Sequence, residues 1–286
     1  MEDLSGRVAV VIGGGSGIGR GIALGLAAEG MRVVVADIDA ASAEGVRDEI
    51  TDADGAATAT GVDGTDRGSL ARLAEGTVAE YGAVHVLSTN VGVVADRPLT
   101  TASEADWAWI IEFNLMSAVR AVDVFLPHLR AAGSAHIVIT ASLAALLAPP
   151  SVSGVHLGLY TATKHALLGY AESLRGELAG DGIGVSLLCP GMVRSNLAAT
   201  SARHRPTRHG GPLPPPPDRE PPVTMMAPEA VGPVVARGIR SDRLHILTHP
   251  ESLGLVEARH AAVVDDFTFF AADRARESDG APEVRP

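Results

Sequence analysis

The chain has 286 residues, of which 46% are hydrophobic and 20% charged, and its formal net charge is −11. These values are typical of an ordinary globular protein and exclude a wholly disordered chain. The acidic balance disfavours nucleic acid or an anionic membrane surface as a partner, because both would repel the protein.

The sequence predicts neither membrane insertion nor secretion. No apolar run approaches the roughly 18 residues that a bilayer-spanning helix needs. The acidic start Met1-Glu2-Asp3-Leu4 is unlike a secretory signal. Cys189 is the only cysteine, which excludes an intrachain disulfide and a multi-cysteine metal site. We therefore expect a cytoplasmic protein with no membrane partner.

Short runs rich in valine and isoleucine alternate with longer amphipathic patterns along the first two thirds of the chain. The predicted strands are 7–12, 32–36, 57–61, 84–88, 135–140 and 184–189, and the predicted helices are 17–28, 40–50, 69–81, 104–130 and 160–178. Strands that are apolar on both faces and separated by helices imply right-handed crossovers and a parallel sheet. The expected fold is therefore a Rossmann-type doubly wound α/β sheet, with residues 1–286 forming a single domain.

The regular pattern breaks over residues 198–227. Nine of the 18 prolines lie between Pro206 and Pro228, which favours extended loop conformations. Apolar residues in or beside this stretch suggest a lid over a partly apolar substrate pocket: Leu197, Leu213, Met225 and Met226. A helix over 228–239, a strand over 244–247 and a last helix over about 251–272 are predicted next. The polar residues 275–286 are expected to be a frayed tail.

A glycine-rich turn, Gly13-Gly14-Gly15-Ser16-Gly17-Ile18-Gly19, follows the first predicted strand and precedes a helix. Such a turn lets backbone N–H groups approach a pyrophosphate at the positive end of the helix. A flexible glycine turn is the alternative. The strand–turn–helix context predicts dinucleotide binding, and the expected contacts are Gly13, Gly15, Ser16, Gly17, Ile18 and Gly19.

Asp37 ends the second predicted strand, 18 residues after Gly19. A carboxylate there can accept hydrogen bonds from the adenosine ribose hydroxyls and would repel a 2′-phosphate, so NAD is expected in preference to NADP. A capping or turn aspartate is the alternative. Asp63, after the third strand, could accept from the adenine amino group or simply serve a turn. The expected adenosine side of the site is Asp37, Ile38, Asp63 and Gly64.

Tyr160 and Lys164 are four residues apart in a predicted helix, so both side chains can reach a common point. A phenol has an ordinary pKa of about 10, and a neighbouring ammonium group favours the phenolate and lowers that pKa. The chain has three tyrosines and a single lysine, the other 22 basic residues being arginine. Chance placement of that lysine four residues after a tyrosine is rare, so the pair predicts an acid–base group.

These segments together resemble the short-chain dehydrogenase/reductase family. The glycine-rich turn and Tyr160-Thr161-Ala162-Thr163-Lys164 match the family's glycine segment and its YxxxK motif. The resemblance covers about residues 4–196 and implies hydride transfer between an alcohol carbon and a nicotinamide cofactor. It also implies that Tyr160 is the acid–base residue, and that Lys164 lowers its pKa and holds the nicotinamide ribose.

Further roles carry over position by position. Ser142, at the end of the fifth strand, matches the serine that orients the substrate oxygen, although a serine in a strand-end turn is the alternative. Asn114, in the long predicted helix, matches an asparagine that supports a water relay, unless it is a buried amide that bonds the backbone. The remaining positions that the resemblance implies lie beside the nicotinamide (Pro190, Gly191, Val193 and Ser195) and in the cofactor floor (Asn90 and Gly92).

The sequence also departs from the family pattern. Ile12 stands where a threonine is usual, and Thr89 stands where the first of two asparagines is usual. Both changes touch hydrogen bonds that brace the cofactor floor. The segment between Ser142 and Tyr160 is longer than is common, and its extra residues, which include Pro149, Pro150 and His156, are expected to alter the substrate mouth.

The sequence therefore predicts an NAD-dependent alcohol dehydrogenase or ketoreductase that acts on a lipophilic or aromatic secondary alcohol or ketone. Its catalytic residues would be Asn114, Ser142, Tyr160 and Lys164, with Ser142 and Tyr160 contacting the substrate. No catalytic metal is expected, because the histidines lack a convincing ligand spacing with a carboxylate.

Assembly and two alternative functions complete the expectations. The resemblance implies a homodimer or homotetramer formed through the helices 104–130 and 160–178. One alternative is a cofactor-sensing binding protein on the same fold, without turnover. Another is an epimerase or dehydratase that uses transient oxidation, although such enzymes usually carry a different glycine spacing.

Overall fold

The computed structural model describes residues 1–148, 155–214 and 224–279. The chain divides into two compact units, Met1–Thr248 and His249–Pro286. The first unit contains the sheet and every residue of the predicted site. The second unit contains a short 3₁₀ turn, η6 (Pro250–Ser252), and a long helix, α9 (Leu253–Asp279).

Seven parallel strands form one sheet in the order β3-β2-β1-β4-β5-β6-β7. Their bounds are β1 (Val8–Ile12), β2 (Arg32–Asp37), β3 (Ala56–Gly61), β4 (Val86–Thr89), β5 (Ala135–Thr140), β6 (Ile183–Cys189) and β7 (His245–Leu247). The strand order reverses between β1 and β4, and ligands of open α/β sheets bind outside the carboxyl ends of the strands at such a point. The predicted doubly wound parallel sheet is confirmed.

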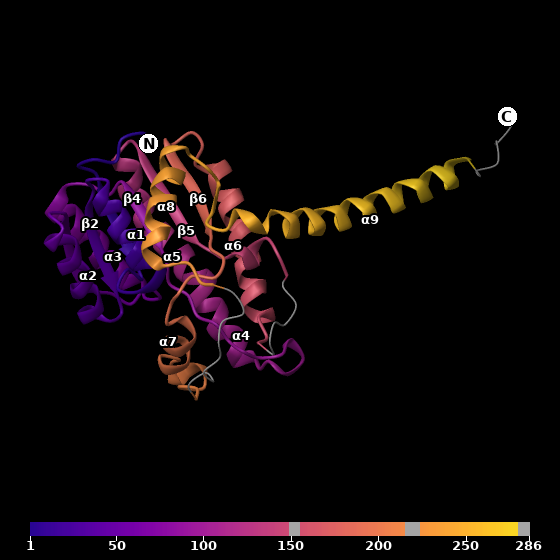
Figure 1. Ribbon diagram of the computed structural model, residues 1–286, viewed down its shortest axis with the longest axis horizontal. Helices are drawn as coiled ribbons and strands as arrows, with labels where there is room; N and C mark the ends of the chain where they lie inside the picture. The colour runs from indigo at the N-terminus through magenta and orange to yellow at the C-terminus, as the bar shows by residue number, and fades with distance from the viewer. Residues whose placement is uncertain (149–154, 215–223, 280–286) are drawn as a thin grey trace. The chain divides into compact units, whose positions relative to one another are not determined.

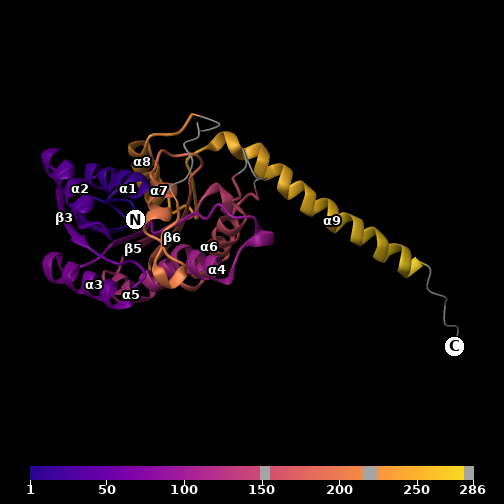
Figure 2. The same ribbon diagram turned by 90° about the horizontal axis from the view of Figure 1, so that it is seen from below.

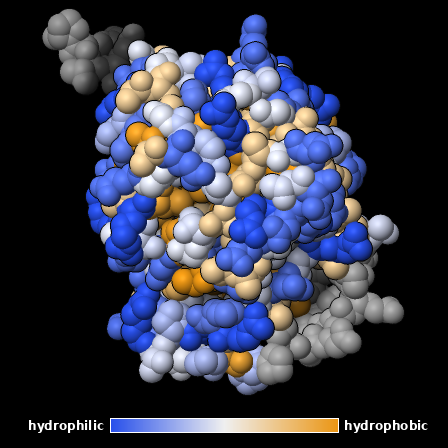
Figure 3. Space-filling view, turned by 90° about the vertical axis from the view of Figure 1, so that its left-hand side faces the viewer, coloured by the Kyte–Doolittle hydropathy of each residue, from blue (hydrophilic) through white to orange (hydrophobic). Residues whose placement is uncertain are grey.

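Helices cover both faces of the sheet (Figures 1 and 2). One face carries α1 (Gly17–Ala28), α2 (Ala40–Asp52) and α8 (Val231–Arg240), and the other carries α3 (Arg67–Tyr81), α5 (Ser117–Ala131) and α6 (Gly158–Glu177). Figure 3 shows the side of this unit that carries α2, β3 and α3, where hydrophilic residues cover most of the surface and apolar residues show mainly in the recesses.

The strands read as continuous apolar runs because both of their faces are buried. In β1, Val10 and Ile12 belong to the core beneath α3, α5 and α6, whereas Ala9 and Val11 belong to the core beneath α1, α2 and α8. All four side chains are at most 1% exposed. Alternate residues of a strand point to opposite faces, so a central strand such as β1 needs apolar residues throughout, whereas the edge strands β3 and β7 are partly exposed.

The single helix predicted over 104–130 is divided in the structure. Helix α4 (Glu104–Ile111) starts with a capping box between Ser103 and Asp106. A π-helical turn, η2 (Glu112–Met116), then separates it from α5. The π turn holds Asn114, and such turns often occur at functional sites. A hydrophobic pattern with a period near 3.6 residues cannot show one extra residue in a turn, which is why the sequence predicted a continuous helix.

The start of the proline-rich segment is more ordered than the extended loop that the sequence predicted. Helix α7 (Leu197–Arg203) and the 3₁₀ turn η4 (Thr207–His209) occupy its first part, and Val193 pairs with Met226 in a β-bridge. Residues 215–223 lie outside the described residues, as do Pro149 and Pro150 of the longer segment before Tyr160. The predicted helix over 228–239 begins as a 3₁₀ turn, η5 (Pro228–Ala230), and continues as α8. Two further 3₁₀ turns are η1 (Leu99–Thr101) and η3 (Leu143–Ala145).

In the second unit, α9 runs through Asp279, so residues 275–279 of the predicted frayed tail are helical, and residues 280–286 lie outside the described part. Within the ranges that the structure describes, none of the helices is both long and apolar enough to span a bilayer.

Two glycines of α1 allow the chain after residue 227 to pack directly on that helix. A Cβ at Gly21 would lie 1.9 Å from the carbonyl oxygen of Pro228, and a Cβ at Gly25 would lie 2.4 Å from the Cα of Gly232. Such distances are far shorter than any atomic contact, so glycine is required at both positions. This close approach holds α8 against the layer that carries the glycine-rich turn.

We predict opposite effects for two glycine-to-alanine substitutions in helices. Gly25→Ala should destabilise the protein by about 1–3 kcal/mol, because overpacking outweighs the better helix propensity of alanine. Gly45→Ala, in α2, should stabilise it by about 0.5–1 kcal/mol, since nothing lies within 4 Å of the added Cβ. Urea unfolding of both variants measures the two values. A neutral or stabilising effect of Gly25→Ala would contradict the close helix packing.

Candidate active site

A cavity of about 430 Å³ lies at the carboxyl ends of the central strands, where the strand order reverses. This volume is in the range of small-molecule and cofactor sites. Most of the residues predicted from the sequence line it: Gly13, Ser16, Gly17, Ile18, Gly19, Asp37, Ile38, Asp63, Gly64, Asn90, Gly92, Tyr160, Lys164 and Ser195. Residues from seven or more separate segments therefore meet at one place.

The glycine-rich turn forms a cradle in which side chains have no room. The amide groups of Gly13 and Gly14 both donate to the carbonyl oxygen of Ala36, at 2.7 and 3.0 Å. A Cβ at Gly19 would lie 1.9 Å from the carbonyl oxygen of Gly13. Gly13 and Gly17 have φ values of +75° and +51°, which glycine adopts without strain. The turn leads into the N-terminus of α1, where unpaired N–H groups favour an anion. These features fit the diphosphate of a dinucleotide.

Asp37 lies beside this turn and is held by two backbone amides. Its Oδ2 accepts from Gly15 at 2.9 Å, and its Oδ1 accepts from Asp39 at 3.1 Å. Gly15 therefore supports the carboxylate and does not line the cavity itself. Helix α2 is capped by Asp39, which accepts from Ser42, so the capping role considered for Asp37 belongs to its neighbour. Each oxygen of Asp37 retains a lone pair that can face a hydroxyl group in the cavity.

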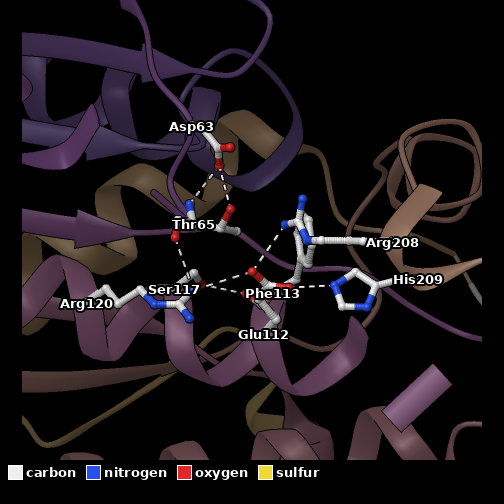
Figure 4. A network of polar contacts seen from close by, with 8 residues as sticks. All are labelled: Asp63, Thr65, Glu112, Phe113, Ser117, Arg120, Arg208 and His209. Carbon is white, nitrogen blue, oxygen red and sulfur yellow. Dashed lines mark hydrogen bonds and ion pairs between the residues drawn. The ribbon is translucent and has the colours of Figure 1, made fainter. Parts of the chain in front are cut away.

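Asp63 lines the cavity and also closes a turn. Its Oδ1 accepts from the backbone N–H and the hydroxyl of Thr65, at 2.8 and 2.7 Å. The turn role that the sequence left open is therefore present, and Oδ2 is the oxygen that remains for a ligand. The carbonyl oxygen of Thr65 accepts from Arg120 at 3.0 Å, which connects this turn to α5 (Figure 4).

Asn90 braces the floor of the cavity by joining three strand ends. Its Nδ2 donates to the carbonyl oxygen of Ile12 at 3.0 Å, and its Oδ1 accepts from the hydroxyl of Thr140 at 2.6 Å. Ile12 thus contributes a backbone oxygen where its side chain cannot hydrogen bond. Next to it, the hydroxyl of Thr89 is buried and has no hydrogen-bond partner among the described residues. This orphaned hydroxyl stands at one of the two positions where the sequence departs from the family pattern.

Tyr160 and Lys164 lie on one face of α6 and both reach the cavity. The Lys164 ammonium nitrogen is 5.3 Å from the centre of the Tyr160 ring and donates to the carbonyl oxygen of Thr140 at 3.0 Å. Only 3% of Lys164 is exposed. The helix therefore presents both groups to the cavity that the glycine-rich turn also lines.

The pKa of Tyr160 differs from the expectation. Burial raises it to about 12, and a hydrogen bond with the Ser142 side chain opposes that rise only in part. Burial also lowers the pKa of Lys164 to about 8. The sequence predicted that the lysine would lower the pKa of the tyrosine. In this structure the loss of water around the phenol is the largest influence on that pKa, and it acts in the opposite direction. Ser142 is nevertheless placed at the phenol, on the turn that follows β5.

Asn114 is a buried amide whose partners are all on the protein. Its Oδ1 accepts from the amide of Val93 at 2.6 Å, and its Nδ2 donates to the carbonyl oxygen of Val93 and the hydroxyl of Thr163, at 2.9 and 3.0 Å. It does not line the cavity. These bonds join the π turn and the chain after β4 to α6, next to Lys164.

The segment after β6 contributes unequally to the cavity. Ser195 lines it and lies against the glycine-rich turn, where a Cβ at Gly17 would be 3.2 Å from that of Ser195. The carbonyl oxygen of Pro190 accepts from Leu143 at 2.8 Å, which positions the Ser142 turn. The predicted contacts Pro190, Gly191 and Val193 do not themselves line the cavity.

The α7–η4 segment, residues 197–213, closes one side of the cavity, and most of its contributions were not predicted. Its lining residues are Leu197, Thr200, Ser201, Arg203, His204, Pro206 and Arg208. The hydroxyl of Ser201 accepts from the amide of Val94 at 3.0 Å, which ties α7 to the chain after β4. This segment has no clear periodicity, so only its composition hinted at a role. Thr140 was missed for another reason, since its chemistry depends on the neighbouring strand ends.

A buried ion pair anchors this segment to α4. Arg205 lies 2.7 Å from Asp106, and their side chains are 5% and 8% exposed. The Arg205 guanidinium also lies 4.8 Å from the centre of the Trp109 ring and donates to the carbonyl oxygen of His209 at 2.6 Å. Burial opposes ionisation of Asp106, but hydrogen bonds from Ser103 and Arg205 lower its pKa overall.

A second polar connection joins the segment to the π turn. Glu112 accepts from His209 at 2.5 Å and from Arg208 at 3.1 Å, and Arg120 lies 3.7 Å away (Figure 4). Burial opposes ionisation of Glu112, but the hydrogen bonds from His209 and Arg208 outweigh it and lower the pKa. Glu112 precedes Asn114 in the same turn, so this carboxylate links the wall of the cavity to the amide that supports α6.

We predict that Arg205→Met destabilises the protein by about 3–5 kcal/mol, because it leaves the Asp106 carboxylate buried without its cation. Arg208→Met is the matched control. Arg208 is 55% exposed, so the loss of its ion pair should cost about 1 kcal/mol or less. Urea unfolding of both variants measures the difference. Equal effects would show that the Asp106 pair does not anchor this segment.

A second prediction concerns pH. In the folded protein the pKa of Lys164 is lowered from 10.5 to about 8. Between these two pH values Lys164 is largely protonated in the unfolded chain and largely unprotonated in the folded protein. The contribution of Lys164 to stability therefore rises as pH increases across this window. Relative to the wild type, Lys164→Met should be about 3 kcal/mol more stable against unfolding at about pH 7 than at about pH 10.5. A pH-independent difference would contradict the buried lysine.

Comparisons with known proteins agree with this geometry. A family model for the short chain dehydrogenases matches residues 7–206. A Cα-dehydrogenase from Sphingobium sp. strain SYK-6 is 30% identical over 96% of this chain and 90% of its own length. A cyclohexanol dehydrogenase from Acinetobacter sp. strain SE19 is 33% identical over 68% of this chain and 75% of its own length. A crystal structure of a short-chain dehydrogenase/reductase from Burkholderia phymatum, in complex with NAD, superposes with a TM-score of 0.81 at 32% identity, covering 93% of this chain and 97% of that one.

Proposed function

The chain belongs to the short-chain dehydrogenase/reductase family, and from this premise we propose that it is an NAD-dependent oxidoreductase that interconverts a secondary alcohol and a ketone. That it is an oxidoreductase for substrates of the alcohol and ketone type follows from the family and its relatives. The observation that carries the finer proposal is that Tyr160, Lys164 and the glycine-rich turn line one cavity at the point where the strand order reverses.

The proposed acid–base group is the Tyr160 phenol. With a pKa raised to about 12 by burial, it is protonated near neutral pH and suited to donate a proton to a ketone oxygen. In the opposite direction the phenol must lose its proton to accept the one on a substrate hydroxyl, and a positive charge beside it favours that loss. The Lys164 ammonium, 5.3 Å from the ring, supplies this charge. A bound nicotinamide ring would supply the hydride acceptor or donor.

Ser142 and Asn114 have supporting roles in this proposal. Ser142 hydrogen bonds with Tyr160 and can donate to the same substrate oxygen, which fixes that oxygen at the phenol. Asn114 holds Thr163, the residue before Lys164, and so positions the lysine. The water relay through Asn114 stays a prediction.

NAD in preference to NADP is supported by the charge at the adenosine end. The Asp37 carboxylate faces the cavity beside the glycine-rich turn and would repel a 2′-phosphate. Two further carboxylates, those of Asp39 and Asp63, line the same cavity. The similar structure from Burkholderia phymatum was solved with NAD. The residues proposed to hold the dinucleotide are those of the glycine-rich turn with Asp37, Asp63, Asn90, Lys164 and Ser195.

A lipophilic or aromatic substrate is supported by the walls of the cavity near Tyr160. Val93, Phe113 and Leu197 line the cavity, and Tyr160 packs with Trp109 and Leu213 in one apolar cluster. A relative that acts on cyclohexanol fits this class. We propose that the α7–η4 segment belongs to a substrate lid that spans residues 198–227.

Assembly and location remain proposals that rest on the family. A homodimer or homotetramer through α4, α5 and α6 is proposed, and size-exclusion chromatography with light scattering measures its mass. A cytoplasmic location is proposed from the sequence.

Tyr160→Phe tests the proposed function. The variant should bind NAD with unchanged affinity and lose about 100- to 10,000-fold in turnover, because it lacks only the proton-exchanging hydroxyl. Turnover is followed by NADH absorbance with a panel of hydrophobic secondary alcohols, and NAD binding by calorimetry.

Tyr170→Phe is the matched control, since Tyr170 lies on the same helix and packs against the core away from the cavity. It should retain wild-type turnover. Near-wild-type turnover of Tyr160→Phe would overturn the proposed mechanism. A wild-type protein that binds NAD but forms no NADH with any alcohol would instead indicate a binding protein.

A further inference from the structure

Three arginines of the α7–η4 segment have different surroundings. Arg205 forms a buried ion pair with Asp106, and Arg208 forms an ion pair with Glu112. Arg203, the last residue of α7, is exposed and lines the cavity. Its Nε donates to His204 Nε2 at 2.9 Å, whereas its terminal Nη atoms have no hydrogen-bond or ion-pair partner among the described residues. Its terminal donors are therefore available to a ligand.

The position of Arg203 is set by contacts at both ends of α7. The chain enters the helix from Ser195, which lies against Gly17 of the glycine-rich turn. At the far end of the helix, Arg203 lines the cavity, as Asp39 does. The pKa of Asp39 is lowered mainly by hydrogen bonds from Ser42, with a smaller contribution from the charge of Arg203. Asp39 follows Asp37 by two residues and lines the same cavity. Helix α7 therefore starts just after the contact with the glycine-rich turn and ends at a residue that lines the same cavity as Asp37 and Asp39.

The residues around this part of the cavity carry more negative than positive charge, so a cation there would affect the binding of an anionic ligand. The glycine-rich turn itself contains no basic residue, and Arg20, the next residue along α1, is paired with Glu49 and Glu229. Lys164 donates to Thr140 at the Tyr160 side of the cavity. Asp37, Asp39 and Asp63 bring negative charge. These carboxylates oppose the binding of a dinucleotide that carries two or more phosphate charges, and a cation beside the phosphates reduces that repulsion.

We propose that Arg203 binds a phosphate group of the dinucleotide and so fastens α7 over the bound cofactor. This inference rests on the proposed function, because it takes a dinucleotide to be the ligand of the cavity. A guanidinium presents a planar set of donors that suits phosphate oxygens. The phosphate can be the diphosphate bridge, which any such dinucleotide carries, or the 2′-phosphate of NADP. In both cases one residue of α7 contacts the cofactor directly.

Calorimetric titration of Arg203→Gln tests the proposal without any turnover. The ligands are NAD, NADP, ADP-ribose and adenosine. The variant should bind the ligands whose phosphate Arg203 contacts roughly tenfold more weakly than the wild type, since a charge-assisted hydrogen bond is lost. These are NAD, NADP and ADP-ribose if the contact is with the diphosphate, and NADP alone if it is with the 2′-phosphate. Adenosine, which has no phosphate, should bind equally to both proteins. Arg203→Lys should recover part of the loss, because it restores the charge without the planar donors.

Arg237→Gln is the matched control for charge. Arg237 is exposed on α8 and does not line the cavity, so its removal changes the net charge equally and should leave every affinity unchanged. Equal losses for NAD and NADP assign Arg203 to the diphosphate, and a loss for NADP alone assigns it to the 2′-phosphate.

Two results overturn the proposal and leave the proposed function standing: unchanged affinities in Arg203→Gln, or an equal loss for adenosine. A wild-type protein that binds neither NAD nor ADP-ribose would contradict the proposed function itself. The two failures are therefore distinguishable.

Discussion

The hydrogen bond from the Lys164 ammonium to the carbonyl oxygen of Thr140 is the contact on which the site depends. It joins α6 to the end of β5, and the same helix carries Tyr160 into the cavity. The lysine is buried, and its pKa of about 8 leaves the group charged at neutral pH yet close to titration. Arginine keeps its charge at any ordinary pH and is bulkier and planar, so it would not fill this place. This requirement explains why position 164 is a lysine although the other 22 basic residues of the chain are arginines.

The surroundings of that contact are built from polar groups that bond one another. Asn90 joins the ends of β1, β4 and β5, and Asn114 joins the π turn and the chain after β4 to α6. Two of the three asparagines of the chain therefore serve to join segments around the cavity. Buried polar groups that are fully bonded hold a single geometry, because any rearrangement would leave one of them without a partner. The cavity is thereby rigid on the side of the sheet.

The opposite wall is held by charge. The α7–η4 segment is anchored to α4 by Arg205 and Asp106 and to the π turn by His209 and Glu112. The Arg205–Asp106 pair is buried and costly to break, whereas Glu112, the partner of His209, is only partly buried. The fold thus combines a fixed half that contains the acid–base group with a wall that is attached by a few side chains. Such a division suits a site that must admit and release its ligands.

The sequence by itself determined the alternation of strands and helices, the parallel sheet, the glycine-rich turn and the Tyr160–Lys164 pair. Each of these depends on residues that are close in the chain, so spacing and periodicity are sufficient to find them. Only the tertiary structure decided the π turn at Asn114, the raised pKa of Tyr160, and the place of Arg203 in the wall of the cavity. These features depend on groups that are distant in the chain. Burial and the distance between charges set their energies, and neither quantity exists before the chain has folded.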